Sequence, residues 1–237
     1  MPMSVQHTSP GGAGQRQEMI LIRHAQSTAN ATGIWQGQLD FPLSEQGRLQ
    51  AAAAGRALAG TRISAIYSSP LSRAFETAEI VAREAGFQGE IVAIPDLMER
   101  HGGVLEGHTW AEQEARNPAF VEKFLALPEE ERWTFASAET DEEILARFER
   151  ALAAIRSRHR TTDDPLVIIS HGGFMRAFLR NLFGSGVLPG TERAPNASIT
   201  RLLWDPMEPN AAPQLLELAS TNHLSPEEER QARTRAE

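Results

Sequence analysis

The chain has 237 residues, of which 23 are Lys or Arg and 31 are Asp or Glu, so its formal net charge is −8. This length fits one or two domains and is enough to bury a sizeable core. A hydrophobic share of 41% and a charged share of 23% are typical of a folded globular protein. The acidic balance argues against a protein that binds nucleic acid or anionic membranes over its whole surface. The absence of cysteine excludes disulfide bonds, a thiol nucleophile and zinc sites with cysteine ligands.

The two ends of the chain differ in composition from the stretch between them. Residues 1–17 are polar and rich in Gly and Pro, and they lack the apolar stretch of a signal peptide. Residues 225–237 are strongly charged. No apolar run approaches the ~20 residues needed to cross a bilayer. We therefore expect a flexible leader over 1–17, one domain over 18–224, a charged tail over 225–237 and a cytoplasmic location.

Short apolar runs alternate with helical patterns along the chain, which is typical of a mostly parallel sheet covered by helices. The apolar runs predict strands at 19–22, 63–67, 91–94, 166–169, 199–204 and 214–218. Helix signals begin at about Ser44, at the capping-box sequence Thr140-Asp141-Glu142-Glu143 and at Gly173. Another begins at Ser69-Pro70, where Ser69 is the expected cap and Pro70 the first helical residue. Residues 108–138 contain helical patterns but no strand signal. We predict a single three-layer α/β domain with helices on both faces of the sheet and a helical insert over 108–138.

Charged and imidazole side chains follow the predicted parallel strands at the points where the strands end. Arg23 and His24 follow the first strand, Arg73 lies one helical turn after the second, Glu99 follows the third, and His171 follows the fourth. Ligands of open α/β sheets bind beyond the carboxyl ends of the strands. We therefore expect these five side chains to meet in one active site, capped by the helical insert.

The dipeptide Arg-His carries little information alone, because it occurs three times in the chain. Arg158-His159 ends a charged helical segment, so we expect a solvated helix terminus that favours cations there. Arg23-His24 differs because a buried strand leads into it. A single histidine at a strand end is often a core residue. Two histidines at strand ends with arginines beside them favour a functional site.

These residue types suit a phosphate ester. An arginine side chain is planar and can bind two phosphate oxygens at once. Histidine, with an unperturbed pKa near ~6.5, can act as a neutral nucleophile near pH 7. Gly172-Gly173 lets the backbone approach a ligand and places a helix N-terminus beside it. Because phosphoryl transfer needs mainly positioning and charge neutralisation, this set of residues predicts phosphoryl chemistry.

The sequence offers no clear site for a metal or a nucleotide cofactor. No carboxylate cluster has convincing metal-ligand spacing, and the Walker pattern and a strand-linked Gly-x-Gly-x-x-Gly are both missing. His101 and His108 are seven residues apart, and no carboxylate stands at ligand spacing from them. We expect no metal and no cofactor, with arginine and histidine doing what Mg²⁺ does in other phosphoryl-transfer enzymes.

The motifs resemble those of the histidine phosphatase superfamily, also called the phosphoglycerate mutase-like family. The resemblance rests on Leu21-Ile22-Arg23-His24-Ala25-Gln26-Ser27, Tyr67-Ser68-Ser69-Pro70-Leu71-Ser72-Arg73-Ala74, Leu97-Met98-Glu99, Glu106-Gly107 and Ser170-His171-Gly172-Gly173. Asn196-Ala197-Ser198-Ile199-Thr200 is similar to the family's late strand. The likeness spans about 20–224, which is nearly the whole predicted domain.

The resemblance implies a role for each motif residue. His24 attacks the phosphorus and becomes a phosphohistidine. Glu99 protonates the leaving oxygen and then takes a proton from the hydrolytic water. The phosphoryl oxygens are held by Arg23, Arg73 and His171. The residues expected to contact the phosphate or the rest of the substrate are Asn30, Gln36, Gly37, Arg100 and Gly172.

Two positions depart from the family pattern. Ala25 replaces the commoner Gly after the nucleophile, a small change that we expect to be tolerated. Ala138-Glu139-Thr140 replaces a usual Gly-Glu-Ser, which leaves the role of Glu139 open.

The resulting interpretation is a metal-independent phosphatase that hydrolyses a small phosphate ester, releases inorganic phosphate and binds neither nucleic acid nor membrane. A cofactor-dependent phosphoglycerate mutase would use the same catalytic residues. Such mutases carry an Asn-Lys pair after the glutamate-bearing loop, where this chain has Leu105-Glu106-Gly107-His108-Thr109-Trp110. A catalytically silent binding module of the same fold usually lacks a pocket histidine or arginine, and this chain keeps them all. The natural substrate and the oligomeric state stay open.

Overall fold

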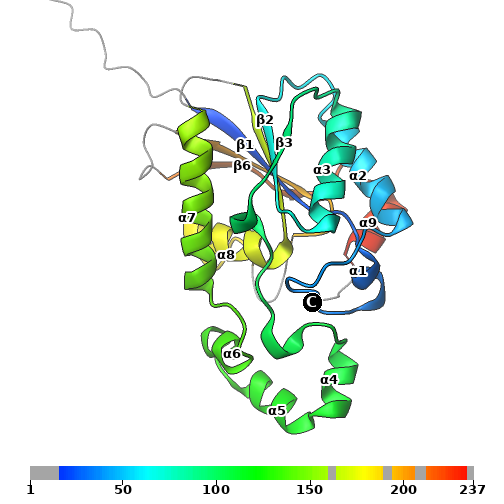
Figure 1. The fold of residues 1–237 in the computed structure, drawn as a ribbon, viewed down its shortest axis with the longest axis vertical. Helices are drawn as coiled ribbons and strands as arrows, with labels where there is room; N and C mark the ends of the chain where they lie inside the picture. Colours follow the sequence, from blue (N-terminus) through cyan, green and yellow to red (C-terminus); the bar gives the residue numbers. More distant parts are fainter. Residues whose placement is uncertain (1–15, 160–163, 189–193, 206–211, 234–237) are drawn as a thin grey trace, which may run out of the picture.

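The computed structural model describes residues 16–159, 164–188, 194–205 and 212–233. These residues build a six-stranded sheet with the order β3-β2-β4-β1-β5-β6 (Figure 1). The strands are β1 (Gln17–Arg23), β2 (Ala65–Ser68), β3 (Ile91–Ala93), β4 (Leu166–Ser170), β5 (Ile199–Trp204) and β6 (Gln214–Ser220). The first four strands are parallel where they pair, β5 runs antiparallel to β1, and β6 runs antiparallel to β5. The predicted mostly parallel α/β sheet is confirmed.

Helices cover both faces of the sheet, as predicted. On one face lie α7 (Asp141–Arg158) and α8 (Gly172–Phe183), and on the other lie α2 (Glu45–Ala57) and α3 (Ser72–Ala85) (Figure 1). In β1, Met19 and Leu21 join the core beneath α7 and α8, whereas Ile20 and Ile22 join the core beneath α2 and α3. A strand covered on both faces buries every position, which explains its unbroken apolar run.

Local capping fixes the helices that carry the site. Thr140 caps α7 through the predicted capping box with Glu143. Helix α3 is followed by Gly86, which adopts a left-handed conformation with φ of 78° and caps the helix. The start of α3 differs from the prediction, because Leu71 rather than Ser69 stands at the N-cap. Ser69 uses its hydroxyl for a contact in the site instead.

The predicted helical insert forms a lobe at one end of the molecule (Figure 1). It consists of α4 (Trp110–Arg116), α5 (Pro118–Ala126) and α6 (Glu129–Phe135). Its own small core contains Leu105, Phe124 and Trp133. Two arginines of α8, Arg176 and Arg180, form ion pairs of 2.5 and 3.1 Å with Glu129 of α6 and tie the lobe to the sheet-covering layer.

The segment after Ser225 is more structured than the predicted charged tail. It contains α9 (Pro226–Ala232), whose buried Ala232 packs with Ala53 of α2 and Leu224. Backbone carbonyls of α9 also accept hydrogen bonds from side chains of the body, including Gln231 O from Gln26 Nε2 at 3.2 Å. Helix α9 packs against the body through Ala232, and its charged residues lie toward the solvent. A composition dominated by these charged residues therefore suggests a tail.

The remaining parts of the chain bear on two further predictions. Residues 1–15 of the expected leader lie outside the described residues, but Gln17 is the first residue of β1 and is buried. The short helix α1 (Thr28–Thr32) and the 3-10 turns η1 (Pro95–Leu97) and η2 (Gly103–Leu105) complete the described elements. Among the described residues, no helix combines the length and the apolar character needed to span a bilayer.

Candidate active site

The register of the sheet brings two histidines together. Arg23, the last residue of β1, pairs with Ser170, the last residue of β4. The backbone N–H of His24 donates to Ser170 O at 2.8 Å, which keeps the chains in register one residue beyond the strands. The ring centroids of His24 and His171 are consequently 5.0 Å apart.

His24 is fully buried, and its surroundings select one form of the ring. Its Nδ1 lies 2.7 Å from the carbonyl oxygen of Ala25. A carbonyl oxygen can only accept, so Nδ1 carries the proton. Burial lowers the pKa of His24 well below its usual value, and the charges of Arg73 and Arg23 lower it further. The neutral ring therefore has its lone pair on Nε2, which is buried and has no hydrogen-bond partner.

His171 stands at the N-cap of α8 and is also fully buried. Its Nε2 lies 2.8 Å from the hydroxyl of Ser69, and its buried Nδ1 has no hydrogen-bond partner. Burial lowers the pKa of His171 well below its usual value, and the charge of Arg73 lowers it further. Both imidazoles are thus neutral near pH 7.

Arg23 is held against the start of α8. Only 6% of its surface is exposed, and its Nη1 donates to Ala194 O at 2.7 Å. A Cβ atom at Gly172 would lie 3.0 Å from the Cζ atom of Arg23. Glycine at this position therefore gives the guanidinium its place beside the helix N-terminus.

Arg73, in the first turn of α3, has no exposed surface. Its Nη1 donates to Leu39 O at 2.9 Å and its Nη2 to Gly37 O at 2.7 Å. Gly37 has φ of 52°, in the left-handed region, and a Cβ atom there would overlap the carboxylate of Glu106. Arg73 thus connects the loop after α1 to the histidine pair, whose pKa values its charge depresses.

The carboxylate of Glu99 lies at the N-terminus of α8. Its Oε1 accepts from the backbone N–H groups of Arg100 and Phe174, both at 2.8 Å, and its Oε2 accepts from Gly173 N at 3.0 Å. A Cβ atom at Gly173 would lie 2.8 Å from Oε1 of Glu99. The two adjacent glycines of α8 therefore each make room for one site residue.

The structure brings together all five residues predicted from the strand ends. Helix α8 links four of them, because His171 lies beside His24, Gly172 beside Arg23 and Gly173 beside Glu99. Arg73 is near enough for its charge to lower the pKa values of both histidines. Asn30, in α1, and Gln36, in the loop that follows α1, are both buried, and their side-chain oxygens lie 3.1 and 2.7 Å from the hydroxyl oxygen of Ser27.

The side chain of Arg100 is engaged within the protein, and its expected contact with the substrate stays a prediction. Its guanidinium pairs with the carboxylate of Asp141, donates to the carbonyl of Glu139 and stacks 4.2 Å from the ring centre of Trp133. Because these partners belong to α6, α7 and the segment between them, Arg100 anchors the insert. Glu99 and Arg100 are adjacent, but their side chains bind different parts of the molecule.

His159 contradicts the expected solvated helix terminus. It is 9% exposed, and its Nε2 lies 2.7 Å from the hydroxyl of Tyr67 in β2. Burial and the neighbouring Arg158 lower its pKa. The arginines that surround His159 in the sequence suggest a solvated site, but its ring has a distant partner in the Tyr67 hydroxyl.

Three residues near the site were not predicted to take part in it. Ser69 contacts His171, and Arg147 and Glu139 contact the backbone around Glu99. Arg147 had one available signal, because it lies between Ile144 and Phe148, which are buried on the core-facing side of α7. A charged residue on such a stripe indicates a specific buried partner.

The described residues contain no group of three or more His, Asp or Glu side chains placed to hold a metal ion. The groups that converge here are two neutral imidazoles, two guanidinium ions, one carboxylate and the N-terminus of α8. Such a set can bind a tetrahedral anion, supply a nitrogen nucleophile and exchange a proton.

Comparison with known proteins agrees with this geometry. Residues 19–213 match the histidine phosphatase superfamily (branch 1), and the chain belongs to this family. The chain is 34% identical over 161 residues to a metal-independent phosphoserine phosphatase of Arabidopsis thaliana. That alignment covers 68% of this chain and 66% of the relative, slightly less than two thirds of its length.

Mycobacterial proteins are similar over a larger share of their length. A glucosyl-3-phosphoglycerate phosphatase of Mycobacterium tuberculosis is 31% identical over 201 residues, which cover 80% of this chain and 87% of that protein. The structure of a mycobacterial glucosyl-3-phosphoglycerate phosphatase in complex with VO3 has a TM-score of 0.70 and 28% identity. It covers 86% of this chain and 100% of that chain. The family predicted from the motifs is confirmed.

Proposed function

We propose that this protein is a phosphomonoester hydrolase that works without a metal, through a phosphohistidine on His24. One observation carries the proposal. His24 is a buried neutral imidazole whose Nδ1 donates to Ala25 O, which leaves the lone pair on Nε2. Its ring lies 5.0 Å from that of His171, and the charges of two arginines act on it. The phosphatase names of the relatives support the same activity.

In the first step, the Nε2 lone pair of His24 attacks the phosphorus of the ester. The bond from phosphorus to the ester oxygen breaks, and its electron pair goes to the departing oxygen. That oxygen takes a proton from the carboxylic acid of Glu99 and leaves as an alcohol. The transferred phosphoryl group stays covalently bound to Nε2.

In the second step, water replaces the histidine. The carboxylate of Glu99 takes a proton from water, the water oxygen attacks phosphorus, and the bond between phosphorus and Nε2 breaks. The products are inorganic phosphate, the neutral His24 ring and the protonated Glu99 with which the cycle began. The same carboxyl group therefore gives a proton in one step and recovers one in the next.

The phosphoryl oxygens are held by Arg23, Arg73 and His171. Guanidinium groups offset the negative charge of the oxygens, and the buried setting strengthens this attraction. The hydroxyl of Ser69 accepts from Leu71 N at 3.3 Å, so its own proton is available for Nε2 of His171. His171 then carries its proton on Nδ1, the atom proposed to donate to a phosphoryl oxygen. Asn30 in α1, and Gln36 and Gly37 in the loop after it, are the residues proposed to contact the phosphate or the rest of the substrate.

The proposed substrate is a small phosphorylated metabolite with an alcohol leaving group. The names of two relatives suggest phosphoserine and glucosyl-3-phosphoglycerate as the first compounds to assay. The insert over 108–138 stands next to the segment bearing Glu99, through Arg100, and is the part of the fold proposed to select among such esters.

The test is release of inorganic phosphate from p-nitrophenyl phosphate, phosphoserine and glucosyl-3-phosphoglycerate, with and without EDTA. We expect turnover that EDTA leaves unchanged and that vanadate inhibits. A parallel assay offers 3-phosphoglycerate with a 2,3-bisphosphoglycerate primer. Isomerisation with negligible phosphate release would identify a mutase, and no turnover of any ester would identify a silent binding module. Either outcome contradicts the proposal.

A further inference from the structure

We infer that Arg147 and Glu139 are a positioning pair for Glu99: together they fix the backbone of the segment from which Glu99 reaches the N-terminus of α8. The inference rests on the proposed function, because it assigns the pair to the proton-transfer step. It also gives Glu139 a role that its sequence motif leaves open.

Every N–H group of the Arg147 side chain has a partner. Its Nε donates to Oε1 of Glu139 at 2.6 Å, and its Nη2 donates to Oε2 at 2.7 Å. The other donors bind main-chain carbonyl oxygens around Glu99. They are Asp96 O at 2.8 Å, Met98 O at 3.0 Å and Glu99 O at 3.3 Å. A guanidinium has five N–H donors, and these contacts use all five.

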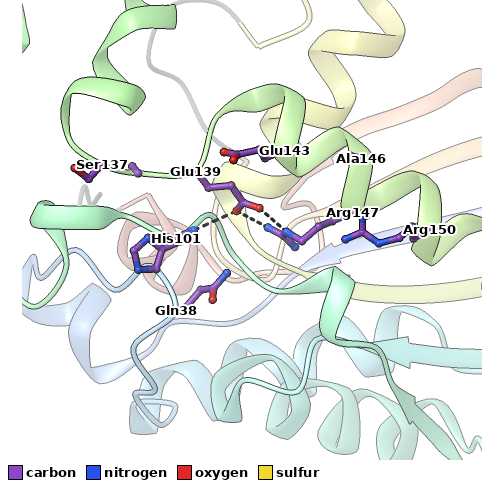
Figure 2. Close-up of a pocket in the computed structure, with 9 residues that line it drawn as sticks. Gln38, His101, Ser137, Glu139, Glu143, Ala146, Arg147 and Arg150 are labelled. Carbon is purple, nitrogen blue, oxygen red and sulfur yellow. Dashed lines mark hydrogen bonds and ion pairs between the residues drawn. The ribbon is translucent and has the colours of Figure 1, made fainter.

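Glu139 fastens the other end of the same segment. Besides the two-pronged contact with Arg147, its Oε2 accepts from His101 N at 3.2 Å (Figure 2). The backbone N–H of Glu139 donates to His101 O at 2.8 Å. Arg147 and Glu139 thus hold the main chain before Glu99, at Glu99 and two residues after it.

The pair reaches the catalytic carboxylate from a second direction through Phe174. The Cζ atom of Arg147 lies 5.6 Å from the centre of the Phe174 ring. The backbone N–H of Phe174 is one of the donors to Oε1 of Glu99. Arg147 therefore contacts both the main chain that carries Glu99 and a residue that binds its carboxylate.

The pair lines a cavity, so its hydrogen bonds support the Glu99 segment where the neighbouring space is not filled by side chains. A cavity of about 510 Å³ lies beside the pair, lined among others by Gln38, His101 and Arg150 (Figure 2). Gln38 adds one more contact, from its Nε2 to Glu99 O at 3.0 Å. The ion pair is well shielded, with 13% of each side chain exposed. Weakening the pair should therefore move the Glu99 backbone before it disturbs the sheet or the histidine pair.

The experiment measures kcat/KM for a series of substituted phenyl phosphates, from p-nitrophenyl to unsubstituted phenyl. These esters share one shape and differ in how much their leaving oxygen needs a proton. Arg147→Lys keeps the charge but cannot make the five planar contacts. Glu139→Gln keeps the size and removes the charge. We expect each variant to slow phenyl phosphate about tenfold more than p-nitrophenyl phosphate, as impaired acid catalysis requires.

Arg150→Lys is the matched control. Arg150 lies on the same helix and lines the same cavity, but its partner is the carboxylate of Asp96, and it is 60% exposed. We expect this variant to leave the dependence on the leaving group unchanged. Arg147→Lys is also combined with Glu99→Gln. If the pair acts through Glu99, the second substitution adds no further dependence on the leaving group.

The outcomes separate this inference from the proposed function. If Arg147→Lys and Glu139→Gln slow all esters by one common factor while Glu99→Gln slows phenyl phosphate selectively, the pair is merely structural and the inference is overturned. If Glu99→Gln itself shows no selectivity, the role proposed for Glu99 fails and the inference fails with it. Glu139→Gln decides the question alone if Arg147→Lys does not fold.

Discussion

The Nδ1 atom of His24 lies 2.7 Å from the carbonyl oxygen of its own neighbour, Ala25, and this contact decides which ring nitrogen can attack. The contact uses the main chain, so it does not depend on the side chain at position 25. Ala25 is itself fully buried, and its N–H donates to the hydroxyl of Thr77 at 3.1 Å. The replacement of the commoner Gly by Ala is therefore compatible with the orientation of the nucleophile.

His24→Ala removes the only group proposed to accept the phosphoryl. We expect kcat for p-nitrophenyl phosphate to fall at least about 10³-fold, as is typical when a covalent nucleophile is deleted. His159→Gln is the control, because His159 is buried but bonds to Tyr67 rather than to the site. Comparable losses in both variants would show that any buried histidine is needed for folding and would remove the special role of His24.

Glu99→Gln keeps the size of the side chain and one of its two accepting oxygens, but it cannot supply a proton. We expect a larger loss of kcat for an alkyl phosphate such as phosphoserine than for p-nitrophenyl phosphate, because the nitrophenolate leaves with little protonation. Steady-state kinetics with both esters measure the difference. Equal slowing of the two would count against Glu99 as the general acid.

The two glycines that open α8 should have separable effects. A methyl group at Gly172 meets the guanidinium of Arg23, and one at Gly173 meets the carboxylate of Glu99. We expect Gly172→Ala to raise KM through Arg23, and Gly173→Ala to slow esters with poor leaving groups most. Gly186→Ala is the control, since its added Cβ would meet no atom within 4 Å. If all three variants behave like the wild type, the close approach is not required.

Acidification should destabilise the fold through the buried histidines. Burial and Arg73 lower the pKa values of His24 and His171 in the folded state, whereas in the unfolded chain they lie near ~6.5. Below that pH these histidines take up protons in the unfolded chain but stay neutral in the folded protein, so the free energy of unfolding decreases as the pH falls. Each histidine contributes about 1 kcal/mol between pH 6.5 and 5.5, and little changes above pH 7.5.

Urea unfolding of the wild type and of His24→Asn at both pH values measures this contribution. The variant should lose about 1 kcal/mol less than the wild type over this interval. Comparing the two losses cancels any change in stability that does not depend on pH. Equal losses of unfolding free energy in the wild type and the variant would mean that His24 is protonated equally in the folded and unfolded states, contrary to its proposed neutral form.

Helix α9 should contribute to stability although most of its residues are charged. Ala232→Glu places a carboxylate against Ala53 and Leu224, and we expect the free energy of unfolding to fall by at least about 2 kcal/mol. Arg230→Ala, on the exposed side of the helix, should change it by less than about 0.5 kcal/mol. Chemical denaturation measures both. If neither substitution changes the free energy of unfolding, the segment behaves as the tail predicted from its composition.

The strand ends could be predicted from sequence because a covered parallel strand must be apolar at every position. The residues directly after such a run, including Arg23, His24 and His171, are then placed by topology alone. The glycines of α8 could be predicted for the same reason. The partners of these residues could not, because Ser69 and His171 are 102 positions apart.

The features that the sequence analysis did not foresee share one physical cause, which is a partner that lies far away in the sequence. Arg100 follows Glu99 but turns to Trp133 and Asp141, and His159 finds the Tyr67 hydroxyl on another strand. The docking of α9 had a local signal, since Ser225 and Glu228 form a capping box with Pro at the first helical position. A local cap predicts a helix, but not the surface against which the helix packs.

The central claim is that His24 carries the phosphoryl group during turnover, and rapid quenching of the enzyme with substrate tests it most directly. The bond between phosphorus and an imidazole nitrogen is labile in acid, so the quench is alkaline, and the peptide containing His24 is then analysed by mass spectrometry. We predict one phosphoryl group on His24 in the wild type, none after an acid quench and none in His24→Ala. Active enzyme that yields unmodified His24 under alkaline conditions, or phosphoryl on another residue, would contradict the account.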